Sequence, residues 1–391
     1  LDDVYIHCRY AQNLLAGNGF SFNPSEAVSA DTSPLWVLLI ALAGLFTSHL
    51  EVAAVLLSAL FYLIIAPGIY RIGRDLLGLE EHWAPFAAAI SLLSSRLIWS
   101  SMSGMEVTLA ALLALLLAEE HARQVGRGYF RIREGVLYGL AVLTRPELAL
   151  LVVLCLGHWI YLRKSQVDIS KLTIGSLIAV ALLMPYVGFN LLVRGGFLPH
   201  SASVQGAGTG ADLGYVWFAT KILTTHNALL LIGAIIALIT FRKKEWLPGL
   251  LFFALLIPLQ AIFAPQYRHH GRYFFPLIPL LVLFGTLGVR HVFDQRQKLV
   301  PVVMIVAILL SAFDAIRWIA LSGYSVRNIN DQQVAAANWV KQHVSDSDRL
   351  AVHDVGAIAY LSDKPVIDLV GLVTPSLYPL QSDQLRVWQE A

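Results

Sequence analysis

Charged residues are scarce in this chain of 391 residues. Asp, Glu, Lys and Arg make up 14% of it, whereas hydrophobic residues make up 57%; an ordinary soluble domain has about a quarter charged residues. The mean hydropathy is +0.65, because the apolar residues form long blocks rather than the spaced stripe of an amphipathic helix. This composition excludes a water-soluble protein with a single core and predicts a membrane protein with several spans.

The chain also has a small net charge and only two cysteines. The formal net charge is +2, and the basic residues are scattered, so we expect no nucleic-acid partner. Cys8 lies near the start and Cys155 inside an apolar block, so we expect no disulfide and no cysteine metal motif. The sequence shows neither a short internal repeat, which disfavours a solenoid, nor the matched halves of many transporters.

Apolar blocks bounded by charges or by Gly and Pro are candidate membrane spans. Several are shorter than the roughly 20 residues that cross a bilayer, so a broken or re-entrant helix is an alternative at Ser95 and around Pro146. The chain begins with Leu1 rather than Met, and we expect one more span before it, which makes eleven. The ten blocks are residues 51–70, 83–95, 105–118, 135–144, 147–162, 172–193, 227–241, 246–264, 273–289 and 299–320.

Clusters of Lys and Arg in alternate loops orient the bundle. They lie at residues 71–74, 123–133, 163–171, 242–244 and 290–298. The positive-inside rule places these loops in the cytoplasm, and therefore places residues 1–34 and the chain after Ser322 outside. Residues 34–50 are apolar, but as a span they would reverse every later loop. We interpret them as a juxtamembrane helix at the outer interface.

The composition becomes more polar after about residue 320. Residues 331–344 have helix-like spacing, and residues 350–363 and 364–372 are short β-like runs broken by Gly and Pro. We therefore expect two parts: an all-α polytopic bundle with juxtamembrane helices at residues 1–320, of which 1–33 are the first outer loop, and a small extracytoplasmic α/β domain at residues 321–391, truncated at its end.

Acidic residues at the outer ends of spans are candidate site residues, because charge near a bilayer is costly. Asp2 and Asp3 can take a proton from a hydroxyl group or hold a divalent metal beside a phosphate. They can equally begin an amphipathic helix expected at residues 4–16. Glu106 lies at the outer mouth of a span, where it is either a site residue or a first-turn residue favoured by the helix dipole.

Other polar residues on the outer side also have two interpretations. Arg268 and Arg272, in YRHHGRY, suit either a substrate phosphate or anionic lipid headgroups. Arg145 and Glu147 flank a proline and can form a simple ion pair. His200 opens a Gly-rich loop that either closes over a substrate or is a linker. The pair His353 and Asp354 suits a metal or catalytic role but is more often structural.

A series of motifs runs in order along the chain. It reads DDVYIHCRYAQNLLAGNGFSFNPSEAVSADTSPLW, then SGME, TRPE, LPHS, RYFFP, DVGAIAY and VIDLVGL. This series resembles the polyprenyl-phosphate-dependent glycosyltransferases of the GT-C superfamily, above all the terminal β-arabinofuranosyltransferases and the family-39-like membrane transferases. The main departures are Ser25, where the family has Gly, the AVSAD stretch that follows it, and His200, where the family has Asn.

The resemblance implies an enzyme of the cell (inner) membrane that transfers a hexosyl or pentosyl unit on the extracytoplasmic side, with inversion. The donor would be a polyprenyl-phosphate sugar, and the acceptor a glycan, lipid or protein of the cell envelope. Catalysis is expected from Asp2 or Asp3, donor phosphate binding from Arg268, Arg272 and Arg9, and further substrate or metal contacts from Glu106, Glu147, His200 and Tyr273. A divalent Mg²⁺, Mn²⁺ or Ca²⁺ on Asp2, Asp3 and Glu106 is the alternative to arginine for neutralising the phosphate.

Two other functions remain open. A transporter or flippase of lipid-linked sugars would need ionisable groups in the middle of spans, or discontinuous helices at the midplane. This sequence has its acidic residues at the ends of spans, which favours the transferase. An inactive scaffold with the same fold is the third alternative.

Overall fold

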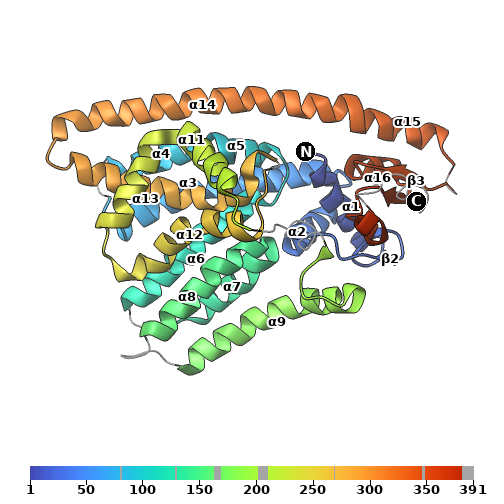
Figure 1. Ribbon diagram of the computed structural model, residues 1–391, viewed down its shortest axis with the longest axis horizontal. Helices are drawn as coiled ribbons and strands as arrows, with labels where there is room; N and C mark the ends of the chain where they lie inside the picture. Colours follow the sequence, from blue (N-terminus) through green and yellow to red (C-terminus); the bar gives the residue numbers. More distant parts are fainter. Residues whose placement is uncertain are drawn as a thin grey trace.

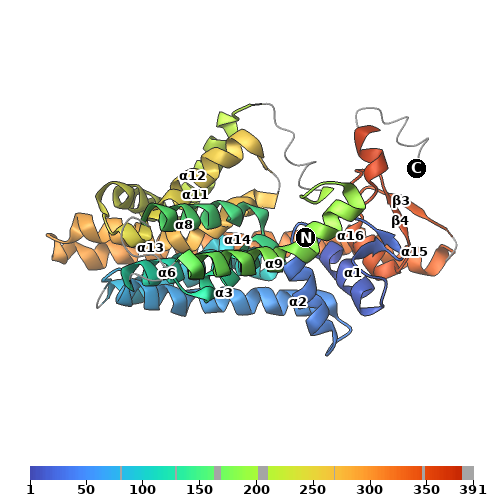
Figure 2. The same ribbon diagram turned by 90° about the horizontal axis from the view of Figure 1, so that it is seen from below.

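The computed structural model describes residues 1–380 except 80–81, 128–129, 163–168, 201–209, 268 and 346–347. The molecule is mostly helical, and its long helices run side by side along the longest axis (Figure 1). At one end of this bundle lie α1 (Asp3–Leu15), α2 (Pro34–Gly44) and α16 (Gly356–Ser362). Turned by 90°, the molecule shows the same division between the bundle and this end (Figure 2).

The helices of the bundle correspond to the apolar blocks of the sequence. In the described part of the chain, six helical stretches are long and apolar enough to cross a membrane, so the chain is a multi-pass membrane protein: Leu50–Asp75, Ile169–Arg194, Leu213–Thr240, Lys244–Phe263, His270–Phe293 and Gln297–His343. The expected count of ten spans is not confirmed, because several of the other helices are shorter than a bilayer requires. The bundle helices are α3 (Leu50–Asp75), α4 (Trp83–Leu92), α5 (Ser95–Met102), α6 (Val107–Arg127), α7 (Ile132–Thr144), α8 (Ala149–Leu162), α9 (Ile169–Arg194), α11 (Leu213–Thr240), α12 (Leu247–Phe263), α13 (Ile278–Phe293) and α14 (Val300–Ile329).

The short helix α2 has 11 residues. At about 1.5 Å per residue it is too short to cross about 30 Å of hydrocarbon. It packs against α1, α3 and α7. This length agrees with a juxtamembrane helix, and its position at the outer interface stays a prediction.

Glycines bring α11 and α13 into close contact. A Cβ atom on Gly288 would lie 1.8 Å from the carbonyl oxygen of Gly233, and one on Gly233 would lie 2.2 Å from that of Gly285. Small residues allow such close approach of helices in membranes. The close packing makes α13 the most buried of the candidate spans, so the 3₁₀ segment η3 (His269–Leu277), which leads directly into α13, has a firm anchor.

Helix α11 is bent at Asn227, whose backbone is extended rather than helical. The side chain of Asn227 donates to the carbonyl of Ala307 at 3.2 Å and to Ser311 Oγ at 2.8 Å, and it accepts from the backbone N–H of Leu230. The apolar block expected to begin at residue 227 is therefore only the second half of α11. The first half begins at Leu213.

The C-terminal region continues from the bundle without a break in the helix. Helix α14 passes through a π turn, η5 (Asn330–Val334), into α15 (Ala335–His343). The boundary expected near residue 320 thus falls inside α14. Strands β3 (Leu350–Val352) and β4 (Val366–Asp368) pair in parallel around α16, and the short helix η6 (Pro375–Leu380) follows. The β-like interpretation of residues 350–363 was wrong for α16, because a short apolar run does not distinguish strand from helix.

The first loop and the C-terminal region are joined through a small hairpin. Strands β1 (Ser21–Asn23) and β2 (Glu26–Ala27) form an antiparallel pair. The Asn23 side chain donates to the carbonyl of Val366 at 2.9 Å and accepts from the Val366 N–H at 3.0 Å. Asn23 thereby pairs with the edge of β4 as a strand residue would. Asn23, in the FNP motif, therefore links the first loop to the C-terminal region.

Candidate active site

The face of α1 that points into the bundle carries two ionisable side chains. Asp3 and His7 are four residues apart and so lie on one side of the helix. An Asp3 carboxylate oxygen is 2.7 Å from Nη2 of Arg272. His7 lies between two carboxylates, with Nδ1 2.5 Å from Asp31 and Nε2 3.3 Å from Glu106. The first segment is therefore tied to both η3 and the start of α6.

Arg145, in the TRPE motif, contacts Glu106, in the SGME motif. Its Nη2 is 2.7 Å from Glu106 Oε1, and its Nη1 is 3.2 Å from Glu147 Oε1. The local ion pair with Glu147 expected from the sequence is present, but Arg145 also binds Glu106. Glu106 is held in place by the turn before it, where Trp36 donates to the carbonyl of Gly104 at 3.1 Å.

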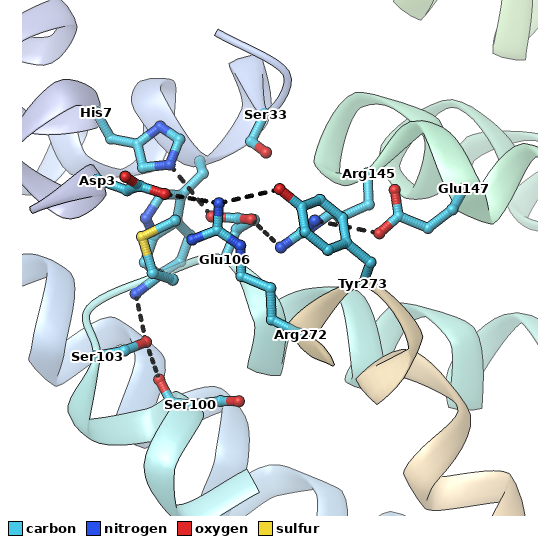
Figure 3. A network of polar contacts seen from close by, with 12 residues as sticks. Asp3, His7, Ser33, Ser100, Ser103, Glu106, Arg145, Glu147, Arg272 and Tyr273 are labelled. Carbon is cyan, nitrogen blue, oxygen red and sulfur yellow. Dashed lines mark hydrogen bonds and ion pairs between the residues drawn. The ribbon is translucent and has the colours of Figure 1, made fainter. Parts of the chain in front are cut away.

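Arg272 and Tyr273 approach the same place from η3 (Figure 3). His270 and Gly271 both have left-handed backbone conformations, with φ of 59° and 82°, and this turn directly precedes Arg272. The Tyr273 ring is near both guanidinium groups, 5.0 Å from that of Arg145 and 5.3 Å from that of Arg272. We refer to Asp3, His7, Asp31, Ser33, Glu106, Arg145, Glu147, Arg272 and Tyr273 as the polar network.

Several hydrogen-bond donors of the polar network are buried and have no partner in the described part of the chain. They are Nε and Nη1 of Arg272, Nε of Arg145 and the hydroxyl of Ser33. Buried polar groups are almost always hydrogen-bonded in folded proteins, and charged donors are especially costly to leave unpaired. The network therefore has the donors that an anionic group would need.

Two carboxylates control the charge of His7. Burial alone would lower the pKa of His7, but Asp31 and Glu106 outweigh it and raise that pKa to about 10. Burial would likewise raise the pKa of Glu106, but Arg145 and His7 outweigh it and hold that pKa well below its usual range. His7 is therefore a cation at neutral pH, and Glu106 is an anion.

Replacing His7 by Gln is expected to destabilise the protein in a pH-dependent way. Because the folded-state pKa is raised, the contribution of His7 is fully present below about pH 6.5, its usual pKa, and is lost as the pH rises through about 10. At pH 6 the loss should be roughly 3–5 kcal/mol, as for other broken buried ion pairs. Thermal unfolding in detergent from pH 6 to 10 measures it.

The control for this experiment is His353→Gln, because the His353 side chain is 79% exposed. It should change the unfolding temperature little at any pH. An effect of His7→Gln that stays constant from pH 6 to 10 would contradict a charged His7.

Of the residues expected at the site from sequence, the structure brings Asp3, Glu106, Glu147, Arg272 and Tyr273 together. The first loop, the Glu106 turn and η3 therefore converge in the structure. Arg268 lies outside the described residues. Asp2, Arg9 and His200 make other contacts, which are described next.

Asp2 faces the C-terminal region. Its carboxylate accepts hydrogen bonds from the backbone N–H groups of Gly356 and Ala357, both at 2.8 Å, and it makes no side-chain cap on α1. A Cβ atom on Gly356 would lie 2.3 Å from the carbonyl oxygen of Asp2, so this contact requires glycine. Asp2 therefore caps α16, a helix more than 350 residues away in the sequence.

Arg9 and His200 also join the first loop to the C-terminal region. Arg9 is buried, donates to the carbonyl of Phe22 at 3.2 Å and forms an ion pair with Asp363. The backbone N–H of His200 donates to the carbonyl of Ser29 at 2.6 Å, and its Nε2 is 3.1 Å from the carbonyl oxygen of Gly371. Both residues lie outside the polar network.

Replacing Asp2 by Ala is expected to loosen α16 without unfolding the bundle. Loss of a capping carboxylate costs about 1 kcal/mol, which corresponds to about a fivefold increase in local opening. Hydrogen exchange at residues 356–362 measures this opening. Asp294→Ala, at the far end of α13, serves as the control, and exchange that is unchanged in Asp2→Ala would contradict the capping role.

The residues proposed from sequence as metal ligands do not form a ligand set. The Asp2 carboxylate is taken by N–H groups, Glu106 by Arg145 and His7, and Asp3 by Arg272. Among the described residues, the group whose ligand atoms lie within 4.8 Å of one another is His121, Glu134 and Cys155. In that group Glu134 accepts hydrogen bonds from Tyr138 and Trp159 and contacts His121. Asp2, Asp3 and Glu106 are thus engaged by other groups of the protein and do not fit a shared metal ion.

Ser25 replaces a glycine of the family pattern without changing the backbone. Its φ is 64°, in the left-handed region that glycine adopts most easily. This conformation lies in the tight turn between β1 and β2. The departure from the NPGE motif therefore keeps the hairpin, at some conformational cost.

Sequence reasoning missed His7, Asp31 and Ser33 and gave Arg145 too small a role. The signal for His7 was its spacing of four residues from Asp3, which places both on one face of the expected helix. Asp31 and Ser33 are near the end of the first loop, where no helical or strand periodicity indicates a direction. Only the fold shows that Asp31 contacts His7 and that the Ser33 backbone N–H donates to Asp31.

The sequence is similar to a curated relative and to a family model. The chain is 28% identical to the terminal beta-(1->2)-arabinofuranosyltransferase of Corynebacterium glutamicum, in a match that covers 78% of this chain and 50% of the relative. The chain thus spans about half the length of this curated relative. A family model described as a domain of unknown function (DUF8728) matches residues 327–390.

Two solved structures of ArnT from Cupriavidus metallidurans superimpose on nearly the whole chain. The one bound to undecaprenyl phosphate has a TM-score of 0.68 and 12% identity and covers 97% of this chain and 84% of ArnT. The chain has the ArnT fold. The apo structure gives a TM-score of 0.67 and 11% identity, with coverages of 97% and 83%. Together, these matches confirm the resemblance to the GT-C glycosyltransferases.

Proposed function

We propose that this protein is a membrane glycosyltransferase that transfers a sugar from a polyprenyl-phosphate donor to an acceptor hydroxyl. The observation that carries the proposal is the pairing of Asp3 with Arg272, whose Nε and Nη1 are buried and unpartnered. A carboxylate and an available guanidinium are the two groups that such a displacement needs. The relative from Corynebacterium glutamicum is named as an arabinofuranosyltransferase, and one of the ArnT structures is bound to undecaprenyl phosphate.

The transfer is a single displacement at the anomeric carbon. The acceptor oxygen forms the new bond to this carbon while the bond to the phosphate oxygen breaks, and the phosphate leaves with the electron pair. Asp3 takes the proton of the acceptor hydroxyl as general base. Arg272 donates hydrogen bonds to the departing phosphate, whose negative charge increases in the transition state. In-line attack without a covalent intermediate inverts the anomeric centre.

Asp3 suits the base better than Asp2. The Asp3 side chain is 28% exposed and pairs with Arg272, the residue proposed to hold the phosphate, whereas the Asp2 carboxylate accepts hydrogen bonds from two N–H groups of α16. We therefore assign the catalytic role to Asp3 and a structural role to Asp2.

Glu106 and Arg145 are positioning residues in this mechanism. Glu106 forms ion pairs with both Arg145 and His7. The guanidinium of Arg145 lies 5.0 Å from the centre of the Tyr273 ring. The free Nε of Arg145 and the Ser33 hydroxyl can add hydrogen bonds to a phosphate already held by Arg272. Two arginines around one phosphate are a common arrangement for strong binding.

We assign the acceptor to a cavity beside the hairpin, which has both polar and apolar lining residues. This cavity has a volume of about 280 Å³, and its lining includes Asn23, Glu26, His200 and Arg349. It also includes Ser29, two residues before Asp31, which contacts His7 in the polar network. A glycan would suit these polar groups, and the extracytoplasmic side of the cell membrane is the location that the charge distribution predicts.

The test is transfer by the purified full-length protein in proteoliposomes supplied with a labelled polyprenyl-phosphate sugar. The expected result is a new glycosidic product, released polyprenyl phosphate and an inverted anomeric configuration by NMR. Movement of the intact lipid-linked sugar across the bilayer without release of polyprenyl phosphate would instead support a flippase. An Asp3→Asn, Arg272→Ala double variant is the negative control.

A further inference from the structure

A second group of cations lies on the other side of η3 from the polar network. A cavity of about 650 Å³ lies between the first half of α11, α5, α14 and η3. Its lining includes Arg96, Lys221 and Arg317, and one carboxylate, Asp314. His270 borders this cavity, whereas Arg272, two residues later, belongs to the polar network. The two sites are therefore neighbours that share one turn of the chain.

Arg96 has the features of an anion-binding residue. It is 3% exposed, and its guanidinium lies 3.7 Å from the centre of the Trp318 ring. Its Nη2 donates to Thr225 Oγ1 at 3.2 Å, but Nε and Nη1 have no hydrogen-bond partner in the ranges that the structure describes. A buried guanidinium with two free donors is costly unless a ligand takes them.

The acidic residue at the cavity does not neutralise these cations. Asp314 accepts a hydrogen bond from Ser95 Oγ at 2.5 Å. Its other oxygen is 3.9 Å from Nη1 of Arg317, which is too long for a hydrogen bond. Three cations facing one carboxylate leave an excess of positive charge at this cavity. This excess favours an anionic ligand.

The surroundings of the cavity favour a ligand with hydrocarbon chains. Phe218, Ile222, Trp318 and Leu321 form apolar parts of its lining. The two helices that border it, α11 and α14, are candidate spans with exposed apolar side chains, among them Trp217 at 71% and Phe313 at 65%. In a membrane such side chains contact lipid. An amphiphile can therefore keep its chains in the bilayer while its headgroup enters the cavity.

We propose that this cavity binds the phosphate group of a membrane lipid, at a site separate from the polar network. Nε and Nη1 of Arg96 donate to the phosphate oxygens, and Lys221 and Arg317 add charge at the rim. The lipid is either an anionic glycerophospholipid or a polyprenyl phosphate, since both present a phosphate group on hydrocarbon chains. The site is independent of the proposed transfer reaction, because it uses none of the residues of the polar network.

Native mass spectrometry of the full-length protein in detergent, titrated with phosphatidylglycerol, tests the proposal. Arg96→Gln is expected to weaken binding about 10- to 100-fold, since it removes the positive charge but keeps an amide group that can donate a neutral hydrogen bond. The double variant Lys221→Gln, Arg317→Gln should weaken it less, and because both side chains are exposed it should fold normally. Arg327→Gln, an exposed arginine further along α14, is the matched control and should bind like the wild type.

Two further titrations identify the source of the phosphate. Undecaprenyl phosphate is tested in an Arg272→Ala background, which removes the contribution of the polar network, with and without Arg96→Gln. Whichever lipid loses affinity with Arg96→Gln is the ligand. Inorganic phosphate should bind much more weakly than either lipid, and equal binding would overturn the lipid assignment. Lipid binding that is unchanged in both the Arg96 variant and the rim double variant would overturn the site itself.

Discussion

An Asp3→Asn variant is expected to transfer sugar about 10²- to 10⁴-fold more slowly than the wild type, the usual cost of losing a general base. Asn keeps the size of the side chain and a hydrogen-bond acceptor for Arg272 but cannot take a proton from the acceptor hydroxyl. The loss should appear in kcat, because proton transfer occurs only in the transition state. Binding of the polyprenyl-phosphate donor should be retained, and the two quantities are measured by product formation and by donor titration.

The matched control for this experiment is Asp2→Asn, which changes the neighbouring carboxylate. Asp2 caps α16 and lies outside the polar network, so its replacement should weaken the C-terminal contact while most of the turnover remains. A mechanism in which Asp2 is the base predicts the reverse order of the two variants. Turnover at the wild-type rate in the Asp3→Asn, Asp2→Asn double variant would exclude both carboxylates as the base.

The contrast between Asp2 and Asp3 shows what could be predicted from the sequence. Both stand at the beginning of an amphipathic helix, and both match the same motif, so no local pattern separates them. They differ only in the partner each side chain meets: Gly356 for Asp2 and Arg272 for Asp3. Each partner is hundreds of residues away, and such long-range pairings arise from the fold rather than from local spacing.

Several residues expected at the site from the sequence are neighbours in the structure, and most of them share a different property. Glu106, Glu147, Arg272 and Tyr273 lie at the ends of apolar blocks, whereas Asp3 begins the amphipathic helix α1. A charged residue in such a position is uncommon in a membrane protein and indicates function. Alternate span ends meet on one side of a bundle, so position along the chain was enough to bring these residues together. Arg145 also lies at the end of an apolar block. A simple ion pair with Glu147 was enough to explain its charge there, so its contact with Glu106 was not expected.

The expected span count is not confirmed, for a related reason. Hydropathy identifies apolar residues but does not show where a helix breaks or changes direction. The short helices α4 and α5, for example, are separated by a break at Leu93 and Ser94. In the same way, α11 is longer than its apolar block because a bend at Asn227 joins a less apolar half to it. The boundary near residue 320 lies inside α14, since a helix can leave the bilayer without changing its backbone. Composition therefore does not locate the ends of helices.

Replacing Arg272 by Ala is expected to weaken donor binding as well as transfer, in contrast to Asp3→Asn. The phosphate of the donor is charged both before and during the reaction, so Arg272 acts on the ground state and on the transition state. Two charge-assisted hydrogen bonds from Nε and Nη1, at about 1.5–3 kcal/mol each, correspond to a loss of donor affinity of about 10²- to 10⁴-fold. The variant also leaves Asp3 without its cation, so the measurement includes an unfolding curve in detergent.

Arg272→Lys is the variant that separates charge from geometry at this position. Lysine keeps the positive charge but cannot present the forked donors of a guanidinium, so it should fold like the wild type and recover only part of the donor affinity. Donor titration at several salt concentrations provides a further check, because the affinity of the wild type should depend more steeply on salt than that of Arg272→Ala. If Arg272→Ala folds normally and binds the donor as tightly as the wild type, the phosphate is held elsewhere and the displacement proposed for this network is wrong.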